Sequence, residues 1–275
     1  MTFSIVGRSA DGASWGVAVA SKFLAVGSAV PAAVAQVGAI ATQADANVAW
    51  KGLALSLLDD GATASVAVQR LIEDDEGRDH RQVGIVDATG GAATYTGTEC
   101  LDWAGGVTSE HAEGSCAIQG NVLTGPEVVD AMLGAWQSTS GDLAQRLMAA
   151  LIAGDEAGGD RRGRQSAALL VVRDGAGYSG GDDIAVDLRV DDHSAPIPEL
   201  MRLLCLNDLY LTASTEAEKV AITPAIRDEL ESLAHKAGHP DFASLVGCEN
   251  YEMRVDHARP PLWIDRRILA ILRGE

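Results

Sequence analysis

The chain opens with Met1-Thr2-Phe3-Ser4-Ile5-Val6-Gly7, a β-prone run that decides the fold predicted for the whole chain. In a strand, the even-numbered residues of this run point to one face, and Phe3 and Ile5 point to the other. Removal of Met1 would give Thr2 a free α-amine beside its hydroxyl. Because an α-amine titrates near pH ~8, much of it is neutral at physiological pH and can accept the hydroxyl proton. The run therefore predicts an N-terminal nucleophile, although many proteins without such activity also begin Met-Thr.

Blocks of predicted strands alternate with pairs of predicted helices. The first two strands, 2–7 and 15–22, are joined through Asp11-Gly12, a dipeptide typical of hairpins. Further strands are predicted at 36–43, 82–87, 92–96, 116–119, 166–172 and 184–190, and helices after Asn47, Thr63, Gly125 and about residue 141. This order does not suit a parallel α/β sheet. It indicates an α+β fold of two antiparallel sheets with helices on both outer faces, a four-layer αββα sandwich over residues 1–195.

Several stretches, in one order, resemble a known family. They are Thr2–Arg8 with Trp15–Phe23, Val37–Ala44 with Asn47, Arg78–Gly84, Gln119–Asn121, Gly125–Glu127 and Gly158–Ala168. Over about residues 2–205 the chain is similar to a bacterial family of unknown function, DUF1028, that is assigned to the N-terminal-nucleophile (Ntn) hydrolases. The resemblance implies the αββα fold and, for the reaction, an amidohydrolase without a settled substrate.

The composition limits the partners of the chain. It has 275 residues, a net charge of −18 and 47% hydrophobic residues. So acidic a protein lacks the cations that displace counterions from nucleic acid or bind anionic membranes. No apolar run approaches the ~20 residues that span a bilayer, and the N-terminus lacks a secretory pattern. We therefore expect a cytoplasmic protein that binds neither nucleic acid nor membrane.

The cysteines and histidines give no sign of a metal or a cofactor. The four cysteines show no CxxC spacing, so they are expected to be reduced and mostly buried. The six histidines form no HxxxH or HxH pair. No phosphate-binding or dinucleotide motif is present either, so we expect no cofactor and no metal.

The last part of the chain, 196–275, has a different character. Helices are predicted at 196–210 and from Thr223-Pro224 to about Lys236, with one strand-like piece at 220–222. We expect a small, mostly helical appendage. It resembles a C-terminal module suggested to bind peptidoglycan, but a cytoplasmic chain would not meet mature peptidoglycan, so a packing or oligomerisation role is favoured. Its apolar end, Trp263, Ile264, Ile268 and Leu269, suggests a homo-oligomer unless these residues pack on the chain's own core.

Four residues are candidates for catalysis: the nucleophile Thr2, and Lys22, Asn47 and Asn121. Lys22 ends the second strand next to Thr2, where a cation would lower the pKa of the amine; the alternative is a solvated lysine. Asn47 and Asn121 follow strands where helices begin, positions that suit oxyanion donors, although Asn47 is also explained as a helix cap.

Three residues are candidates for substrate binding: Gln43, Arg162 and Arg164. Gln43 ends the third strand near Asn47, and its amide is a second candidate oxyanion donor. The arginines lie in Asp160-Arg161-Arg162-Gly163-Arg164, the most basic stretch of an acidic chain. Because arginine binds carboxylates through two parallel hydrogen bonds, they suggest a carboxylate-bearing small amide as substrate. The alternative is a set of solvated loop charges.

Two functions remain open from the sequence. In the first, Thr2 attacks a small amide, and its own amine acts as base and then as acid. In the second, Met1 is retained and the same fold serves as a non-catalytic binding or assembly protein. The intact mass of the mature chain separates the two.

Overall fold

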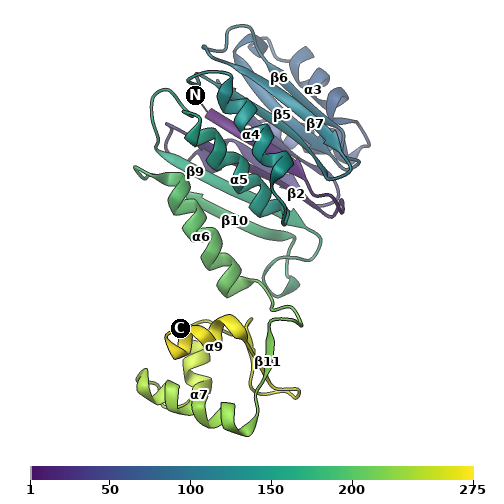
Figure 1. Ribbon diagram of the computed structural model, residues 1–275. Helices are drawn as coiled ribbons and strands as arrows, with labels where there is room; N and C mark the ends of the chain where they lie inside the picture. Colours follow the sequence, from purple (N-terminus) through teal and green to yellow (C-terminus); the bar gives the residue numbers. More distant parts are fainter. Residues whose placement is uncertain (1) are drawn as a thin grey trace. The chain divides into compact units, whose positions relative to one another are not determined.

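The computed structural model describes residues 2–275, which form two compact units divided between Arg202 and Leu203 (Figure 1). Helix α6 (Pro196–Leu211) runs from the first unit into the second. The division therefore falls inside this helix, whereas the sequence suggested a boundary before it. None of the helices among residues 2–275 combines the length and the apolar character needed to cross a bilayer.

The first strand lies in the middle of a six-stranded antiparallel sheet. β1 (Thr2–Arg8) pairs with β2 (Ser14–Ser21) on one side and with β8 (Gly114–Asn121) on the other. Gly12 closes the β1–β2 hairpin at φ 69°, a conformation that costs glycine no steric penalty. The strand order is β10-β9-β2-β1-β8-β7, where the remaining strands are β7 (Gly105–His111), β9 (Ser166–Arg173) and β10 (Ile184–Val190).

A second antiparallel sheet has the order β3-β4-β5-β6. Its strands are β3 (Pro31–Val34), β4 (Gly38–Ala44), β5 (Arg81–Asp87) and β6 (Ala92–Thr96). The sequence did not predict β3 or β7. β3 is short and begins with Pro31, which is tolerated because β3 is an edge strand. β7 is an edge strand too, and its glycines and exposed polar residues hide the strand pattern.

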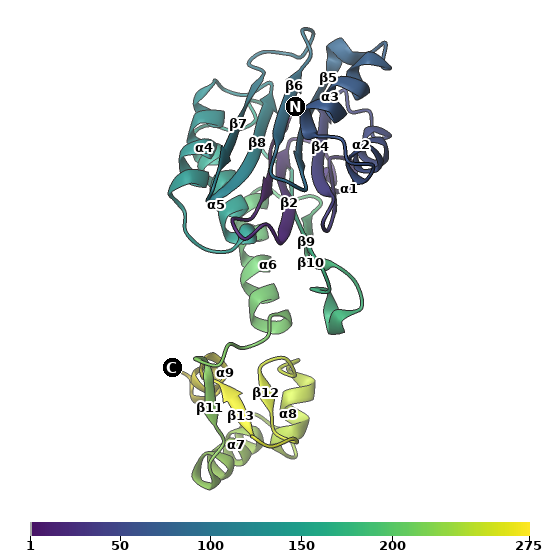
Figure 2. The ribbon, with the colours of Figure 1, turned by 90° about the vertical axis from the view of Figure 1, so that its right-hand side faces the viewer.

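Helices pack on each sheet. α4 (Glu127–Ser138) and α5 (Leu143–Glu156) contact strands of the six-stranded sheet, and α2 (Trp50–Asp59) and α3 (Ala64–Glu73) contact the four-stranded sheet. Strands of the two sheets also contact each other, β1 with β4 and β5, and β8 with β5 and β6. Figure 2 shows α4 and α5 on one side of these strands and α2 and α3 on the other. The predicted α+β class with antiparallel sheets is confirmed.

Local capping explains where two of these helices begin. The Thr63 side chain accepts a hydrogen bond from the Val66 amide at the start of α3. Asp142 and Gln145 form a capping box at the start of α5. The remaining short helices of this unit are α1 (Val26–Ala29) and the 3-10 turns Arg78–His80 and Tyr178–Gly180.

The space between the two sheets is apolar in one part and polar in another. Val6, Val17 and Val86 belong to a buried apolar cluster. Nearer the start of β1, the buried side chains are amides and hydroxyls instead. A buried polar group costs free energy unless it is hydrogen-bonded, so this polar part requires a complete set of partners.

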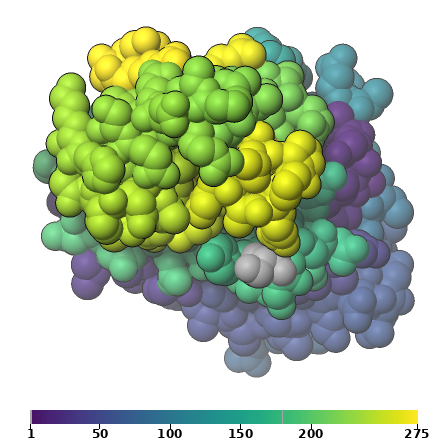
Figure 3. All heavy atoms as spheres, turned by 90° about the horizontal axis from the view of Figure 1, so that it is seen from below, coloured from purple at the N-terminus to yellow at the C-terminus, as the bar shows by residue number. Residues whose placement is uncertain are grey.

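The unit Leu203–Glu275 has a core of its own, and Figure 3 shows its residues, green to yellow, packed as one body. A small sheet has the order β11-β13-β12. Its strands are β11 (Lys219–Ala221), β12 (Val255–Asp256) and β13 (Trp263–Asp265), and its helices are α7 (Pro224–Lys236), α8 (Phe242–Cys248) and α9 (Arg266–Arg273).

The apolar residues at the end of the chain are used inside this unit. Ile264, Ile268 and Leu269 are buried in its core, since α9 packs its apolar face on β13. The alternative that these residues pack on the chain's own core therefore holds for Ile264, Ile268 and Leu269. The small sheet that they cover was only partly visible in the sequence. The homo-oligomer that they suggested stays a prediction with less support.

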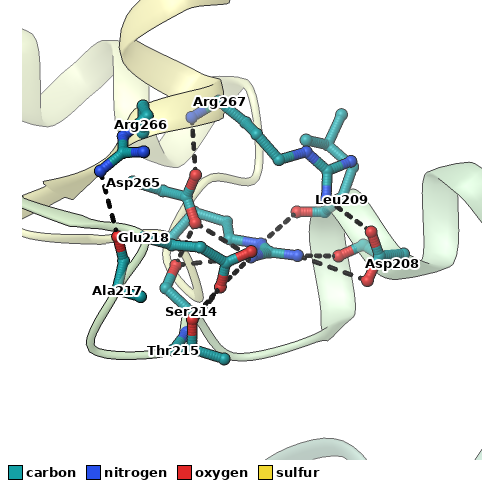
Figure 4. A network of polar contacts seen from close by, with 10 residues as sticks. Asp208, Leu209, Ser214, Thr215, Ala217, Glu218, Asp265, Arg266 and Arg267 are labelled. Atoms are coloured by element: carbon teal, nitrogen blue, oxygen red, sulfur yellow. Dashed lines mark hydrogen bonds and ion pairs between the residues drawn. The ribbon is translucent and has the colours of Figure 1, made fainter. Parts of the chain in front are cut away.

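A buried arginine holds the C-terminal unit together. Arg254 is 1% exposed and donates to Asp265 Oδ2 at 3.0 Å, while Asp265 is 0% exposed. Arg254 also donates to the carbonyl oxygens of Leu209 and Asp208. Figure 4 shows Asp208, Ser214, Glu218 and Asp265 gathered around this point. The guanidinium therefore ties the end of α6 to β13 within this unit.

Candidate active site

Thr2 lies at the start of a strand with a strand on each side. Its register partner on β8 is Asn121, and on the other side Ser21 follows the partner of Phe3 on β2. The Thr2 side chain is buried, and its Oγ1 lies 3.1 Å from Ser21 Oγ. The predicted nucleophile is therefore held in one orientation. Met1, on whose removal its chemistry depends, lies outside the described residues.

The carbonyl of Thr2 is held from the other sheet. Gln43, near the end of β4, donates from Nε2 to Thr2 O at 3.3 Å. The same amide donates to Gln82 Oε1 at 2.8 Å and to Gln119 O at 3.3 Å. Its Oε1 accepts from Ser4 Oγ at 2.7 Å. The structure thus brings Gln43 to Thr2 as predicted. Both amide hydrogens of Gln43 are used in hydrogen bonds within the protein, so neither is left for an oxyanion.

Asn121 lies beside Thr2 and keeps part of its amide uncommitted. Its Nδ2 donates to Gln82 Oε1 at 2.8 Å. Within residues 2–275, Gln82 is the one hydrogen-bond partner of this side chain, so one amide hydrogen and Oδ1 remain available. Of the predicted oxyanion donors, Asn121 is therefore the one that is paired with Thr2 in the sheet and has an amide hydrogen not used within the described residues.

Lys22 lies near Thr2 in the chain fold, but its ammonium points elsewhere. Its Nζ donates to the Arg164 carbonyl at 3.3 Å, and its backbone N–H donates to Asp160 Oδ2 at 2.8 Å. Among the described residues no hydrogen bond joins Lys22 to Thr2. The cation therefore lies along the loop that contains Arg162 and Arg164.

That loop is fastened to the ends of β2 and β8 by a buried carboxylate. The Asp160 side chain is 2% exposed; besides Lys22, it accepts from Arg162, with Nη2 at 3.1 Å. Asp160 also forms a β-bridge with Leu123, two residues after Asn121. Arg162 is thereby held by Asp160 in the loop that follows the ends of β2 and β8.

Arg164 and Asn47 have other partners. Arg164 Nε donates to both carboxylate oxygens of Asp155, at 2.7 and 3.0 Å, and this hydrogen bond raises the pKa of Arg164. Asn47 donates to Asp75 Oδ2 at 2.8 Å and accepts from the Ala49 amide. Asn47 therefore lies in a turn before α2, whose N-cap is Ala49, and within the described residues no hydrogen bond joins Asn47 to Thr2.

A second charged cluster surrounds Asn47. Arg81 pairs with Asp75 and with Asp45 at 3.1 and 2.9 Å. Burial would raise the pKa of Asp75, but hydrogen bonds from Asn47, Arg81 and the Gly77 amide outweigh burial and lower it. Asp75 therefore stays ionised and holds Asn47 in place.

Sequence reasoning missed three residues of the site: Ser21, Gln82 and Asp160. The hairpin register sets Ser21 opposite Thr2, so this residue could have been found from the β1–β2 pairing alone. Gln82 and Asp160 are brought to the site by chain segments far from β1; they lie in the family-like stretches Arg78–Gly84 and Gly158–Ala168, and this resemblance was the one signal for them. Among residues 2–275, no group of three or more His, Cys, Asp or Glu side chains is placed to hold a metal ion.

Comparisons with known proteins identify the family of the chain and a solved structure that it resembles. Residues 2–200 match the model described as a family of unknown function, DUF1028. The chain belongs to this family. Among solved structures it is similar to a DUF1028 protein from Silicibacter pomeroyi, known from a crystal structure, with 32% sequence identity and a TM-score of 0.66 over 75% of this chain and 89% of that one. No curated protein matches the chain.

The DUF1028 match contains every residue of the candidate site, from Thr2 to Arg164, and ends before the C-terminal unit begins. The description of the DUF1028 family states no activity. The function is therefore inferred from the geometry of the site.

Proposed function

We propose that this DUF1028 protein is an Ntn-type amidohydrolase with a four-layer αββα sandwich fold, in which Thr2 is the nucleophile. The observation that supports it best is the position of Thr2. It begins the central strand β1, its Oγ1 is 3.1 Å from Ser21 Oγ, and Asn121 lies opposite it on β8 with an uncommitted amide hydrogen. Nucleophile, base and oxyanion donor are then all supplied by two neighbouring strands.

The proposed reaction needs a free Thr2 amine. Thr2 Oγ1 attacks the amide carbon while the amine takes the hydroxyl proton. The carbonyl oxygen becomes an oxyanion and accepts a hydrogen bond from Asn121 Nδ2. The amine then passes the proton to the departing nitrogen, which leaves an ester on Thr2. Water next attacks this ester: the amine takes a proton from the water and passes it to Thr2 Oγ1, which leaves as the carboxylic acid is released.

The substrate proposal rests on the loop at Asp160. Arg162 is 40% exposed at its side chain, so it can offer part of its guanidinium to a ligand. A carboxylate there would gain parallel charge-assisted hydrogen bonds, although Asp160 competes for them. We therefore propose a small, carboxylate-bearing amide. Arg164 and Lys22 would contribute positive potential along the same loop.

The alternative is a non-catalytic protein that retains Met1. It is favoured by one observation: the Gln43 amide is wholly used to hold Thr2 O, Gln82 and Gln119. Such a network also suits a purely structural strand end. The two functions differ in whether the Thr2 amine is free.

Intact-mass measurement and periodate treatment test the proposal together. Periodate oxidises an N-terminal threonine because its amine and hydroxyl are adjacent, and it leaves a chain that begins with Met1 unchanged. We expect a mass that lacks Met1, periodate sensitivity, and hydrolysis of members of a panel of small N-acyl amides. Thr2→Ala should abolish hydrolysis without unfolding the protein. Thr108→Ala, at an exposed position of β7, is the control and should keep full activity. A mature chain that retains Met1 would overturn the enzyme proposal and favour the alternative.

Three further properties stay proposals. They are a peptidoglycan-binding C-terminal unit, a cytoplasmic location and a homo-oligomer. Co-sedimentation with purified peptidoglycan, cell fractionation and light scattering test them in that order.

A further inference from the structure

We infer that Gln82 is a positioning residue for Thr2 and acts through a layer of buried amides between the two sheets. The inference rests on the proposed function for its catalytic meaning. Its structural basis is independent of that function, because it consists of hydrogen bonds within the described chain.

The amide layer is defined by Ser4, Gln43, Gln82, Gln119 and Asn121, each at most 2% exposed. The residues come in opposed pairs. Gln43 and Gln82 are register partners on β4 and β5, and Ser4 and Gln119 are register partners on β1 and β8. The inner faces of packed sheets are normally apolar. Amides buried there lower the stability of the fold unless their hydrogen bonds are all made.

Gln82 is the residue of the layer that touches most strands. Its Oε1 accepts from Gln43 Nε2 and from Asn121 Nδ2, both at 2.8 Å. Its Nε2 donates to Gly120 O at 2.7 Å, to Thr96 Oγ1 at 2.9 Å and to Gly105 O at 3.3 Å. One side chain on β5 therefore joins β4, β6, β7 and β8.

The two hydrogen bonds that Gln82 Oε1 accepts determine the orientation of the Gln43 and Asn121 amides beside Thr2. Because one oxygen accepts from both amides, Gln43 and Asn121 must both turn their NH₂ groups toward it. With that orientation, Gln43 can also donate to Thr2 O at 3.3 Å. The other amide hydrogen of Asn121 is then the one left for an oxyanion. Gln82 thus orients both residues that flank Thr2 without itself touching Thr2.

At the Ser4 and Gln119 end of the layer, a glycine on the opposite sheet leaves room for the Gln119 amide. Gln119 Nε2 donates to Ser4 Oγ at 2.7 Å, and Ser4 Oγ donates to Gln43 Oε1 at 2.7 Å. Gln119 passes over Gly84 of β5, where a Cβ atom would lie 2.0 Å from Gln119 Oε1. A glycine at this position therefore lets an amide from one sheet cross to the other.

The test compares Gln82→Met with Thr94→Val. Methionine keeps the shape of Gln82 but removes its hydrogen bonds. Thr94 donates to Val83 O and lies 3.5 Å from Gln119 Oε1, so its valine variant removes a polar group at the far end of the layer. Both variants disturb the same buried region, and only the first releases Asn121 and Gln43.

With an active protein, the expected result is a split between the variants. Gln82→Met should lower kcat by roughly 10–100-fold with KM changed little, since small misplacements of reacting groups cost rates of this order. It should slow covalent labelling of Thr2 by a β-lactone by a similar factor. Thr94→Val should keep kcat and the labelling rate within about twofold. If Gln82→Met keeps both rates, the positioning inference is overturned while the proposed function stands.

If the wild-type protein hydrolyses no amide, the proposed function fails, but the positioning role of Gln82 can still be tested. Amide hydrogen exchange at Thr2–Ser4 is then the readout. Faster exchange there in Gln82→Met, with β9 unchanged and Thr94→Val like wild type, supports a positioning role for the start of β1. Equal exchange in all three proteins overturns it.

Discussion

Replacing Arg254 by methionine removes the cation at the centre of the C-terminal unit and keeps much of its volume. The change leaves the carboxylate of Asp265, which is 0% exposed, without its buried counter-charge at 3.0 Å. Taking one partner out of a buried pair costs about 3–5 kcal/mol, because the remaining charge stays in a medium of low dielectric. At roughly 0.05–0.15 kcal/mol per residue, the unit Leu203–Glu275 holds only about 4–11 kcal/mol. We therefore expect Arg254→Met to remove a large share of its stability.

Hydrogen exchange measured by mass spectrometry on the full chain resolves this effect by region. At about 1.4 kcal/mol per factor of ten, exchange in α7 and α9 should accelerate roughly 10²–10⁴-fold. Peptides from β1 and β2 should not change. Arg273→Met is the matched control: Arg273 pairs with Glu229 at 2.7 Å, but solvent screens this surface pair, so exchange in α7 and α9 should change little.

The pH dependence gives the same prediction a second measurement. Burial would raise the pKa of Asp265, but hydrogen bonds from Ser214, the Arg267 amide and Arg254 outweigh burial and lower it. The stability that this carboxylate contributes is present above its unfolded-state pKa of ~3.9 and is lost as pH falls through the lower folded-state value. In Arg254→Met the buried carboxylate loses its cation, so its pKa rises and the variant should be less impaired at pH 4 than at pH 7.

Two outcomes would refute this reasoning. One is an acceleration below tenfold in α7 and α9, and the other is an equal effect of Arg273→Met. Either would mean that apolar packing alone holds the unit together. The variant Arg254→Met/Asp265→Asn should recover part of the loss, because asparagine removes the stranded charge and can still cap α9.

Two further predictions concern the first unit and the cysteines. Burial raises the pKa of Cys116 to about 12, so iodoacetamide should modify exposed Cys248 in the native protein and Cys116 only after denaturation. Peptide mass spectrometry measures the labelling of both cysteines, and labelling of Cys116 in the native protein would contradict its burial. Gly84→Ala should cost about 1–3 kcal/mol by crowding Gln119, whereas Gly134→Ala, in α4 with open space around it, should raise stability by about 0.5–1 kcal/mol. Thermal melting compares the two glycine variants, and equal melting temperatures would show that Gln119 moves aside without cost.

Local patterns were enough to predict much of the first unit. The alternating run at the start of the chain and the Asp11-Gly12 turn predicted the β1–β2 hairpin, which is present with Thr2 at the start of a central strand. Thr63 was also recognised at the start of α3. These features depend on residues a few positions apart, so the sequence alone contains the information that specifies them.

The candidate site was predictable only in part. Thr2 and Asn121 are brought together as expected, since both lie at strand ends of one sheet. Lys22 and Asn47 were placed near Thr2 by the same reasoning, but their side chains bond to Arg164 O and to Asp75. The reason is that strand order determines where a backbone lies, whereas the direction of a long polar side chain depends on whichever partner satisfies it.

By itself, the sequence determined most helices and strands of the first unit, the hairpin at the start of the chain and the residue that begins the central strand. Only the tertiary structure decided what surrounds that residue. The amide layer joins Ser4, Gln43, Gln82 and Gln119, which lie on four strands separated by many residues in the chain and meet only when one sheet packs on the other. Each of these residues has an ordinary strand position in the sequence. Their common role arises because buried amides must find hydrogen-bond partners, and the packing of the two sheets determines which partners are within reach.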